Sequence, residues 1–271
     1  MSKKLILRSS KVNTFLRCRK RYYWEYVENL SSKDVSMPLQ IGSVVHHLLH
    51  KYYTGELTPE MISNLQEYVF TLYPESPDMG EAVAVEAAVL VGGYIHRWRD
   101  DNIKVISSEV IVEVDMGEYI MKGRVDGIAR SIDDSRLWRL EHKTSKRMDS
   151  SYLSGLKGGL QGSMYDFLLE DLFKEPIAGT IYNILVKTKV PQYDRAFSPR
   201  DMGMRKRMFE TLENVAKDIK SGNFYPSCNC FDYGRPCEFK PLCDNEDEAT
   251  KKAFYIQREY SLDNREEVEA V

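Results

Sequence analysis

Long apolar runs are lacking in this sequence, so we expect no membrane-spanning helix. The apolar stretch near the N-terminus, Leu5 to Leu7, is too short for the apolar core of a signal peptide, and Arg8 interrupts it. We therefore expect a cytoplasmic protein that does not associate with membranes. Thiols stay reduced in that compartment, which argues against a framework of disulfides.

An excess of positive charge is also lacking. The chain has 38 lysines and arginines against 41 acidic residues, which gives a formal net charge of −3. This is not the profile of a protein that coats nucleic acid non-specifically. Short basic patches at 17–21, 143–147 and 205–207 remain, and each fits a solvated surface equally well. With 42% hydrophobic and 29% charged residues, the composition is that of an ordinary globular protein.

Cysteine is scarce, and its distribution is uneven. The five cysteines are Cys18, Cys228, Cys230, Cys237 and Cys243. In a reducing compartment, four cysteines close together near the end of the chain predict a metal or iron–sulfur site. Zinc is an alternative, although the spacing is looser than that of a CxxC zinc knuckle. If Cys18 supplies a fourth ligand, the bound group ties the first helix to the C-terminal region.

Apolar residues recur with the period of an α-helix in several segments. The predicted helices cover residues 9–26, 42–53, 58–101, 152–172 and 201–220. Gly55 is expected to stop the second helix, and Pro74 and Pro77 are expected to break the third. The third segment resembles a helical cover over the core and shows no chemistry of its own.

Alternation with a period of two predicts a three-stranded meander in the middle of the chain. Its strands begin near residue 105, at 119 and at 137, and a further apolar strand covers 177–187. Helices and strands in this order predict an α/β or α+β core. Beyond Cys243 the chain is polar and rich in acids, and we expect it to be peripheral.

Two of the predicted strands carry the residues that point most clearly to chemistry. Asp126 lies on one strand, and Glu141 and Lys143 lie on the next. Residues two apart on a strand share a face, so Glu141 and Lys143 point the same way and His142 points the other way. Neighbouring carboxylates favour a cation between them, and oxygen ligands suit Mg²⁺ or Mn²⁺. A lysine beside such an ion can orient a water or stabilise charge on a phosphate. His46, on the second helix, is a further candidate ligand.

Six motifs occur in an order that matches a known family. They are Cys18 in a basic and aromatic helix, Gly42 with His46, Gly123 to Asp126, Glu141-His142-Lys143, Gln161 with Tyr165, and the terminal cysteines. Together they make the chain similar to the RecB-type nucleases of the PD-(D/E)XK superfamily. The chain most resembles their iron–sulfur branch, which includes the AddB nuclease domain and the CRISPR-associated RecB-like exonucleases. Val125 stands where the family signature has proline, which is a departure from the literal motif.

The resemblance implies a role for each matched residue. The ligands of the catalytic divalent metal would be His46, Asp126, Glu141 and the backbone carbonyl of His142. Lys143 would position or activate the attacking water. Contacts with DNA would come from Gln161, Tyr165, Arg17, Arg21 and Lys146. A [4Fe–4S] cluster would be held by Cys18, Cys230, Cys237 and Cys243, which leaves Cys228 as the surplus thiol.

The implied fold is a PD-(D/E)XK core, in which helices flank a central mixed sheet. It would form one nuclease domain over residues 1–243. This domain would include a helical insertion at 58–101 and an iron–sulfur module made of residues 1–30 and 222–243. Residues 244–271 would form a polar, acidic C-terminal tail.

The predicted function is that of a metal-dependent DNA nuclease, an exonuclease on single-stranded DNA or duplex ends. One alternative is a non-catalytic DNA-end-binding or scaffold subunit of a recombination or repair complex, but the candidate catalytic set is complete, which argues against it. Another is a zinc-stapled protein whose acidic strands form a solvated sheet face, which leaves the six ordered motifs as coincidence. The resemblance allows a role in recombination, repair, CRISPR adaptation or a bacteriophage function, alone or with a helicase or other partner protein.

Overall fold

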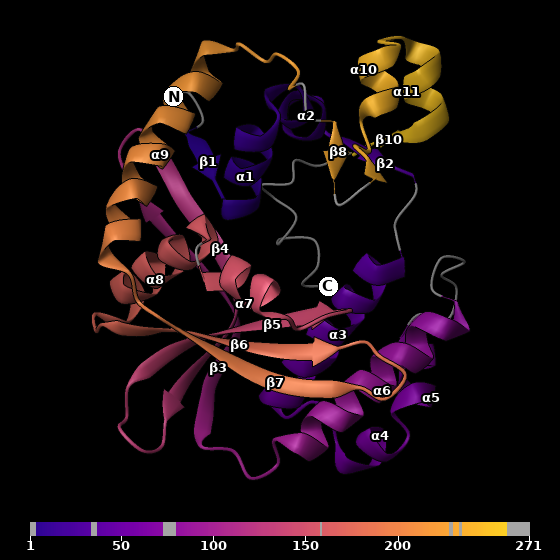
Figure 1. The fold of residues 1–271 in the computed structure, drawn as a ribbon, viewed down its shortest axis with the longest axis vertical. Coiled ribbons are helices and arrows are strands. Elements are labelled where there is room, and N and C mark those ends of the chain that lie inside the picture. The colour runs from indigo at the N-terminus through magenta and orange to yellow at the C-terminus, as the bar shows by residue number, and fades with distance from the viewer. Residues whose placement is uncertain are drawn as a thin grey trace. The chain divides into compact units, whose positions relative to one another are not determined.

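The structure is a computed structural model that describes residues 4–33, 37–72, 80–157, 159–227, 230–232 and 235–258 (Figure 1). The chain divides into two compact units. The first comprises Met1–Val35, Asp115–Met121 and Arg207–Val271, and the second comprises Ser36–Val114 and Lys122–Lys206. The candidate catalytic residues therefore all lie in the second unit, and the five cysteines all belong to the first.

The second unit contains most of a mixed sheet and its helices. Its strands are β3 (Ile103–Asp115), β4 (Tyr119–Ser131), β5 (Leu137–Ser145), β6 (Ile177–Val186) and β7 (Gln192–Pro199). Its helices are α3 (Met37–Thr54), α4 (Pro59–Ser63), α5 (Leu65–Leu72), α6 (Glu81–Arg97), α7 (Ser150–Lys157), α8 (Leu160–Phe173) and the start of α9 (Met202–Ser221). The strand order is β4-β5-β6-β7, and β3 also pairs with β4. The β5–β6 pair is parallel and its neighbours are antiparallel, so the predicted mixed sheet is confirmed.

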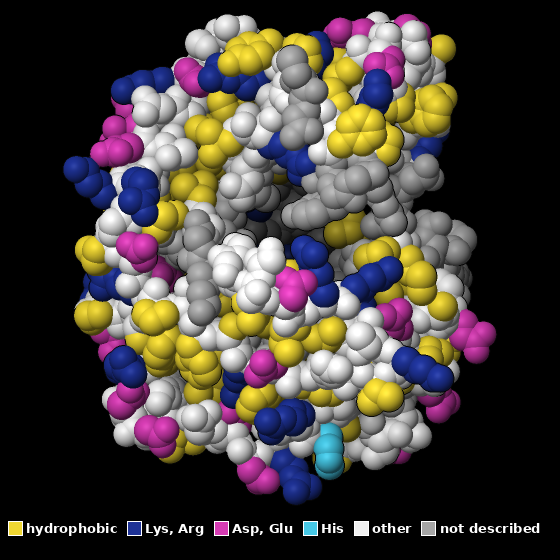
Figure 2. Space-filling view, viewed as in Figure 1, with side chains coloured by type: hydrophobic (Ala, Val, Ile, Leu, Met, Phe, Trp, Pro, Cys, Tyr) yellow, Lys and Arg dark blue, Asp and Glu magenta, His cyan; other side chains and the backbone are white. Residues whose placement is uncertain are grey.

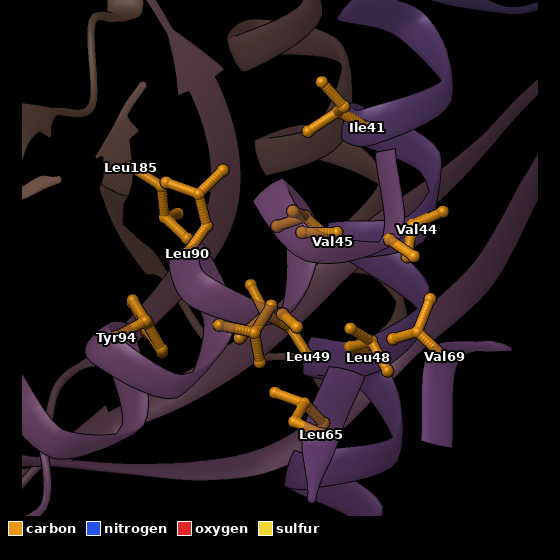
Figure 3. Packing of buried hydrophobic residues seen from close by; sticks show 14 of the residues in the cluster. Ile41, Val44, Val45, Leu48, Leu49, Leu65, Val69, Leu90, Tyr94 and Leu185 are labelled. Atoms are coloured by element: carbon orange, nitrogen blue, oxygen red, sulfur yellow. The ribbon is translucent and has the colours of Figure 1, made fainter. Parts of the chain in front are cut away.

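Helices cover both faces of this sheet, because consecutive side chains of a strand point to opposite sides. Leu185 of β6 packs into a large apolar cluster with α3, α5 and α6 (Figure 3). Ile184 and Val186, its neighbours along the strand, pack instead against residues of α7. The helical cover predicted for 58–101 is thus present as α4, α5 and α6. Pro74 and Pro77, which are expected to break it, lie outside the described residues.

The helix α3 brings a histidine to the sheet. It ends at Thr54, and Gly55 has a φ of 77°, a left-handed conformation that glycine adopts without strain. The predicted stop is therefore confirmed. A Cβ placed on Gly42 would lie 3.6 Å from the Oγ1 of Thr144 on β5, so the helix runs close to the strand at this point. His46 follows about one helical turn later.

Two helices predicted as continuous are each divided. The segment from residue 9 to 26 forms α1 (Ser9–Arg17), α2 (Arg19–Tyr22) and a π-helical turn, η1 (Tyr23–Val27). Cys18 interrupts it with extended backbone, φ −158° and ψ 113°, and its Sγ accepts a hydrogen bond from the Arg21 backbone N–H. The predicted helix at 152–172 divides into α7 and α8, because Gly159 is an extended N-cap residue. In both places a residue with extended backbone interrupts a pattern that apolar periodicity alone would continue, and at Cys18 the side chain also caps the next helix.

Two strands of the sheet, β1 (Leu5–Leu7) and β7, are missing from the sequence-based prediction. The strand β7 lies at the edge of the sheet, where most of its side chains are exposed or half-buried. Its sequence, Gln-Tyr-Asp-Arg-Ala-Phe-Ser-Pro, is mostly polar and ends in proline. An edge strand needs fewer apolar residues than a central one, so the hydrophobic pattern of this segment does not predict a strand.

The first unit contains the N-terminal and C-terminal segments. The strand β1 (Leu5–Leu7) pairs in parallel with the start of β4. The other elements are β2 (Leu30–Ser32), β8 (Phe231–Asp232), β9 (Arg235–Pro236), α10 (Lys240–Asp244), α11 (Glu248–Phe254), β10 (Tyr255–Gln257) and the greater part of α9. The strand β10 pairs with β2 and Tyr255 is buried, so the described part of the acidic tail is anchored at this strand, while most of its other described residues are exposed. Apolar side chains at two positions far apart in sequence, Trp24 and Phe239, share the small core of this region.

The surface carries both signs of charge. On the side drawn in Figure 2, lysine and arginine side chains are interspersed with acidic ones, in keeping with the formal net charge of −3. Across the part of the chain that the structure describes, none of the helices combines the length and the apolar character needed to cross a membrane.

Candidate active site

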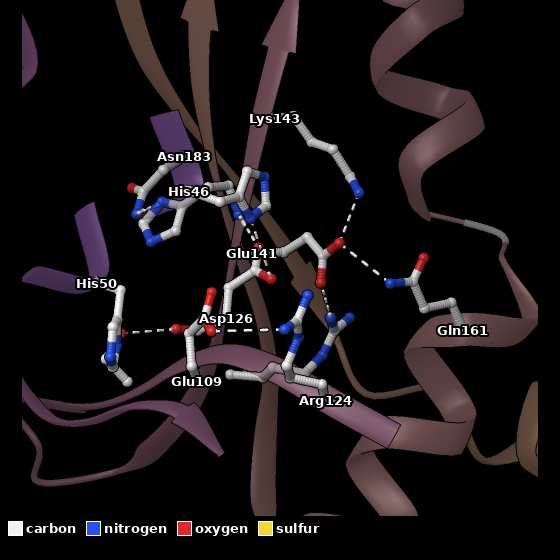
Figure 4. A network of polar contacts seen from close by, with 12 residues as sticks. His46, His50, Glu109, Arg124, Asp126, Glu141, Lys143, Gln161 and Asn183 are labelled. Atoms are coloured by element: carbon white, nitrogen blue, oxygen red, sulfur yellow. Dashed lines mark hydrogen bonds and ion pairs between the residues drawn. The ribbon is translucent and has the colours of Figure 1, made fainter. Parts of the chain in front are cut away.

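Three elements bring the predicted catalytic side chains together (Figure 4). Asp126 comes from β4, Glu141 and Lys143 come from β5, and His46 comes from α3. The antiparallel register pairs Gly127 with Leu140, so one further step along the two strands sets Asp126 beside Glu141. His46 Nδ1 lies 3.4 Å from Asp126 Oδ1, and Lys143 Nζ donates to Glu141 Oε1 at 2.5 Å.

Asp126 is held as a carboxylate by its neighbours. Burial alone would raise its pKa, but the ion pair with His46 and the hydrogen bond from the His142 backbone N–H outweigh burial and lower it well below its usual range. That N–H donates to Asp126 Oδ2 at 2.7 Å. For His46, burial lowers the pKa, and the charge of Asp126 outweighs this and raises it. Each group therefore favours the charged form of the other.

Glu141 has three donors around its carboxylate, and sequence reasoning identified only two of them. Gln161 Nε2, from α8, donates to Oε1 at 3.1 Å, beside the bond from Lys143. The third donor is Arg139, whose NH1 donates to Oε2 at 2.6 Å. Arg139 is fully buried, which is rare for an arginine without paired charges. The alternation of the strand could have indicated it, because Arg139 and Glu141 are two residues apart and share a face.

On the opposite face of β5, His142 lies among aromatic and polar side chains of the second unit. Its ring stacks on Tyr53 of α3 with centroids 5.9 Å apart, and the prediction that it points away from Glu141 is consistent with this position. Burial lowers the pKa of His142 to about 3, so the ring is neutral. Its Nδ1 lies 3.3 Å from Asn183 Nδ2, and Asn183 Oδ1 accepts from Arg195 Nε at 2.7 Å. These contacts fix the strand segment that carries the His142 backbone.

His50, one turn after His46 on the predicted shared face of α3, does not join the catalytic set. Its Nδ1 lies 3.1 Å from Ser108 Oγ, and that hydroxyl donates to the backbone carbonyl of Asp126 at 3.1 Å. His50 therefore braces β3 and β4 against each other. The next residue of β3 is Glu109, whose backbone has a φ of 52°. Its Oε2 lies 3.7 Å from NH1 of Arg124, and Arg124 stands two residues before Asp126 on β4.

The donor chemistry of the site suits a hard divalent cation. Two carboxylates and a histidine are the residue types that bind Mg²⁺ or Mn²⁺. In the part of the chain that the structure describes, no three His, Cys, Asp or Glu side chains are arranged to hold a metal ion as they stand. The reason at this site is visible in the contacts, since Asp126 is paired with His46 and Glu141 with Arg139 and Lys143. A metal would compete with these ion pairs, and a protonated His46 would have to lose its proton to bind one.

The residues predicted to contact DNA are placed in different surroundings. Gln161 supports Glu141, and Tyr165 is buried beneath β4, where a Cβ on Gly123 would lie 2.5 Å from its ring. Lys146 is exposed after β5. In the first unit, Arg17 is exposed and donates to the Phe231 carbonyl at 3.3 Å, whereas Arg21 forms ion pairs with Glu25 and Glu238.

Four of the five cysteines line a single cavity in the first unit. They are Cys18, Cys230, Cys237 and Cys243, and Cys228 lies outside the described residues. The backbone N–H groups of Arg21 and Ser227 donate to Cys18 Sγ at 3.4 and 3.3 Å. Burial raises the pKa of the Cys237 and Cys243 thiols, and so do the other cysteines nearby. The cysteines predicted to act together are thus brought together by the fold, although no three of them form a single-ion site as the described chain stands.

Comparisons with known proteins agree with this geometry. Residues 9–244 match the sequence profile of the PD-(D/E)XK nuclease superfamily. The chain is similar to a crystal structure from Eubacterium rectale described as a "Putative exonuclease", with a TM-score of 0.56 and 15% identity over 84% of this chain and 86% of that one. It is also similar to the crystal structure of SSO0001, with a TM-score of 0.37 and 16% identity over 82% of this chain and 79% of that one. No curated protein matches the chain.

The likeness to the Eubacterium rectale structure shows the fold alone, because the sequence identity is low. The sequence profile goes further, since it spans most of the chain, from the first helix to α10. The matched range includes His46, Asp126, Glu141 and Lys143. The chain belongs to the PD-(D/E)XK nuclease superfamily.

Proposed function

We propose that this chain is a divalent-metal-dependent deoxyribonuclease that hydrolyses phosphodiester bonds, working as an exonuclease on single-stranded DNA or duplex ends. The observation that carries the proposal is the convergence of Asp126, Glu141 and Lys143 on one face of the sheet, with His46 beside them from α3. Membership of a nuclease superfamily supports the reaction class. The similar protein described as a "Putative exonuclease" supports action at ends.

Each of these residues has a task in phosphodiester hydrolysis. Mg²⁺ or Mn²⁺ held by His46, Asp126 and Glu141, with the His142 backbone carbonyl, would neutralise charge on the phosphate and lower the pKa of a bound water. Lys143 carries an ammonium group next to Glu141, from where it donates hydrogen bonds to a water or to a phosphate oxygen. The imidazole of His142 lies on the other face and takes no part, while its backbone N–H orients Asp126.

Gln161 and the exposed lysine after β5 extend this site toward the substrate. Gln161 reaches Glu141 from α8, and its amide also has capacity to contact a nucleotide beside the carboxylate. Lys146 is exposed and three residues beyond Lys143, so it can pair with a neighbouring phosphate of the strand. Such contacts weaken steeply as salt is raised.

We also propose that the first unit binds a [4Fe–4S] cluster through Cys18, Cys230, Cys237 and Cys243. The four thiols line one cavity, and two backbone N–H groups donate to Cys18 Sγ, as is common around cluster sulfurs. In a cluster each iron takes one protein thiolate, so the thiolates stand further apart than around a single zinc ion. The four thiols here share a cavity but do not form a site for a single ion, which agrees with the wider spacing of cluster ligands. The cluster would connect residues 1–30 to residues 222–243. It would contribute to the stability of the fold and would take no part in catalysis.

The nuclease proposal is tested with DNA labelled at either the 5′ or the 3′ end. Single-stranded and duplex substrates are incubated with Mn²⁺, with Mg²⁺ or with a chelator, using the wild-type chain, Lys143→Ala and Asp126→Ala. We expect release of nucleotides by the wild type with metal only, no release by either variant, and retained DNA binding by both. The label released first gives the polarity. Equal behaviour of wild type and variants would refute the proposal.

The cluster proposal is tested by purification without oxygen. We expect a brown protein that contains about four irons and four sulfides per chain, as a [4Fe–4S] cluster requires. A colourless protein with one zinc per chain would contradict it, and a protein with no bound metal would do the same.

A further inference from the structure

Trp24, in the first unit, carries a buried N–H group that lacks an acceptor. The residue is 1% exposed and lies in the small core that it shares with Leu30, Phe239, Leu242 and Tyr255. Its indole Nε1 is enclosed, and within the described part of the chain it makes no hydrogen bond. Native proteins leave few buried donors in this state, because each one has given up its bond to water without replacement.

The sulfur nearest to serving as the acceptor is that of Cys243. The core around Trp24 adjoins the cysteine cavity, since Phe239 belongs to both and Leu242 directly precedes Cys243. Burial and Cys18 raise the pKa of the Cys243 thiol, and the indole N–H of Trp24 lowers it, as a donor that faces the sulfur does. A thiol is a weak acceptor, and the contact falls short of a hydrogen bond. A thiolate accepts far better, because bonds to ionised groups are shorter and stronger.

The other cysteines of the cavity also receive N–H groups, but from the backbone. Two backbone N–H groups donate to Cys18 Sγ at 3.4 and 3.3 Å. Burial raises the pKa of the Cys237 thiol, and the backbone N–H of Phe239 opposes that rise. A side-chain substitution leaves such backbone donors in place. The donor of Trp24 belongs to a side chain, so its contribution can be removed and measured.

Two ammonium groups hold the indole ring in place. Lys20 Nζ lies 4.5 Å and Lys251 Nζ 5.5 Å from the ring of Trp24, both within the range of a cation–π contact. Lys20 is itself paired with Glu246 at 2.9 Å, and Lys251 with Glu28 at 3.5 Å. The ring is therefore fixed by its faces, and a phenyl ring at this position keeps an aromatic face without the N–H.

We infer that Trp24 raises the reduction potential of the proposed [4Fe–4S] cluster by donating its indole N–H to the thiolate of Cys243. The inference rests on the proposed cluster, because it takes Cys243 as an iron ligand. Reduction adds one electron and so increases the negative charge on the cluster and its sulfur ligands. A donor aimed at one of these sulfurs stabilises the reduced form more than the oxidised form, so losing the donor lowers the potential.

The test is a potentiometric titration of the full chain, purified without oxygen, in which electron paramagnetic resonance follows the reduced cluster. Trp24→Phe removes the N–H. A second protein carries at position 24 a tryptophan analogue with sulfur in place of the N–H, which keeps the shape of the ring. Leu30→Val is the matched control, because it removes one methylene from the same core and no donor. We expect the equilibrium constant for one-electron reduction to fall about tenfold in both altered proteins, a shift of about −59 mV, and to change less than about twofold in Leu30→Val.

Iron content shows first which proteins hold the cluster. An unchanged potential in the protein with the analogue overturns the inference, and so does an equal shift in Leu30→Val, which would attribute the effect to packing. If Trp24→Phe does not fold or loses its iron, the analogue decides alone. A wild-type chain without a cluster refutes the cluster proposal, and the inference fails with it. A wild type that has the cluster, with the same potential in the altered proteins, refutes this inference alone.

Discussion

Two half-buried carboxylates, one in each unit, have pKa values that shift in opposite directions. In the second unit, Asp126 is surrounded by His46 and a backbone N–H, and these partners outweigh burial and lower its pKa. In the first unit, Glu25 lies beside Arg21, but burial outweighs that partner and the pKa of Glu25 is raised. The partners of Asp126 thus compensate its charge, whereas the charge of Glu25 is only partly compensated.

The same contrast holds for packing. The second unit has a large apolar cluster that α3, α5 and α6 form over the sheet (Figure 3). The cysteine region of the first unit has a core of five buried residues: Trp24, Leu30, Phe239, Leu242 and Tyr255. A core this small rarely supports a fold without a disulfide, a metal or a similar cross-link. The second unit is therefore expected to hold its site by side chains alone, and the cysteine region of the first unit to depend on what its thiols bind.

The largest effect expected in the catalytic unit comes from Glu141→Gln. The change removes a proposed metal ligand and leaves Arg139 buried without its closest anion. We expect cleavage to fall by at least about 10³-fold, because several kcal/mol of charge stabilisation is lost. We also expect the free energy of unfolding to fall by about 3 kcal/mol, which is typical when one partner of a buried pair is removed. Nuclease assays and urea denaturation measure the two effects.

Lys143→Met separates the two consequences. Its side chain is partly exposed, and Glu141 keeps its bond to Arg139 in this variant. Cleavage should fall as far as in Glu141→Gln, while the free energy of unfolding changes by about 1 kcal/mol or less. An equal loss of stability in both variants would contradict the view that Arg139 and Glu141 form the buried pair of the site.

A comparable loss of stability, in the other unit, is expected when one of the four cavity cysteines is changed to serine. Cys18→Ser or Cys237→Ser should abolish the proposed cluster absorbance, because each thiolate holds one iron. We expect a loss of about 3 kcal/mol, or roughly 6–12 °C in Tm, since binding of a structural group is linked to folding. Activity should fall with stability. Iron content and thermal melting are the measurements.

Cys228→Ser is the matched control for the cysteine variants. The motif resemblance leaves Cys228 as the surplus thiol, so the serine variant should keep its iron, its colour and its Tm. Loss of iron from Cys228→Ser, together with its retention in Cys230→Ser, would exchange the roles of these two residues. Retention of iron in every single variant would refute the four-cysteine cluster.

The candidate catalytic residues could be named from the sequence, whereas the residues that support them could not. Glu141 and Lys143 are recognisable because a charged pair at alternate positions interrupts an apolar strand. Arg139 lies at the preceding alternate position of the same strand, so the alternation places it on the same face, but it does not reveal that the side chain is buried. Its burial depends on Thr180 and Tyr165, which are distant in sequence. Cys18 could be named as a candidate ligand, but the break that it makes in the first helix could not be predicted. At that break, its Sγ accepts a hydrogen bond from the Arg21 backbone N–H.

An intermediate effect is expected from Gly123→Ala, which concerns the packing of the catalytic unit. A Cβ at this position would lie 2.5 Å from the ring of Tyr165 and 3.2 Å from Leu168, both buried on α8. The added methyl group would push α8, and with it Gln161, away from β4. We expect a loss of about 1–3 kcal/mol, as is usual for an overfilled core, with reduced cleavage. Urea denaturation and nuclease assays check both.

A second substitution tests whether the clash is the cause. Tyr165→Leu makes room at the same point, so the double variant should lose less stability than the sum of the two single variants. Additive losses would mean that Gly123 is required for another reason, such as the local conformation of β4.

The smallest effect is expected from Glu25→Gln, and it depends on pH. The pKa of Glu25 is raised on folding, first by burial, so the folded protein binds its proton more tightly than the unfolded chain does. The stability that this proton contributes is fully present below the unfolded pKa of about 4.3 and is lost as pH rises through the folded pKa. Glutamine resembles the protonated form at every pH. The variant should therefore match the wild type near pH 4 and be more stable at pH 7, by about 2–4 °C in Tm or less. A variant that is less stable than the wild type at pH 7 would mean that the Arg21 ion pair outweighs burial, and the contrast with Asp126 would disappear.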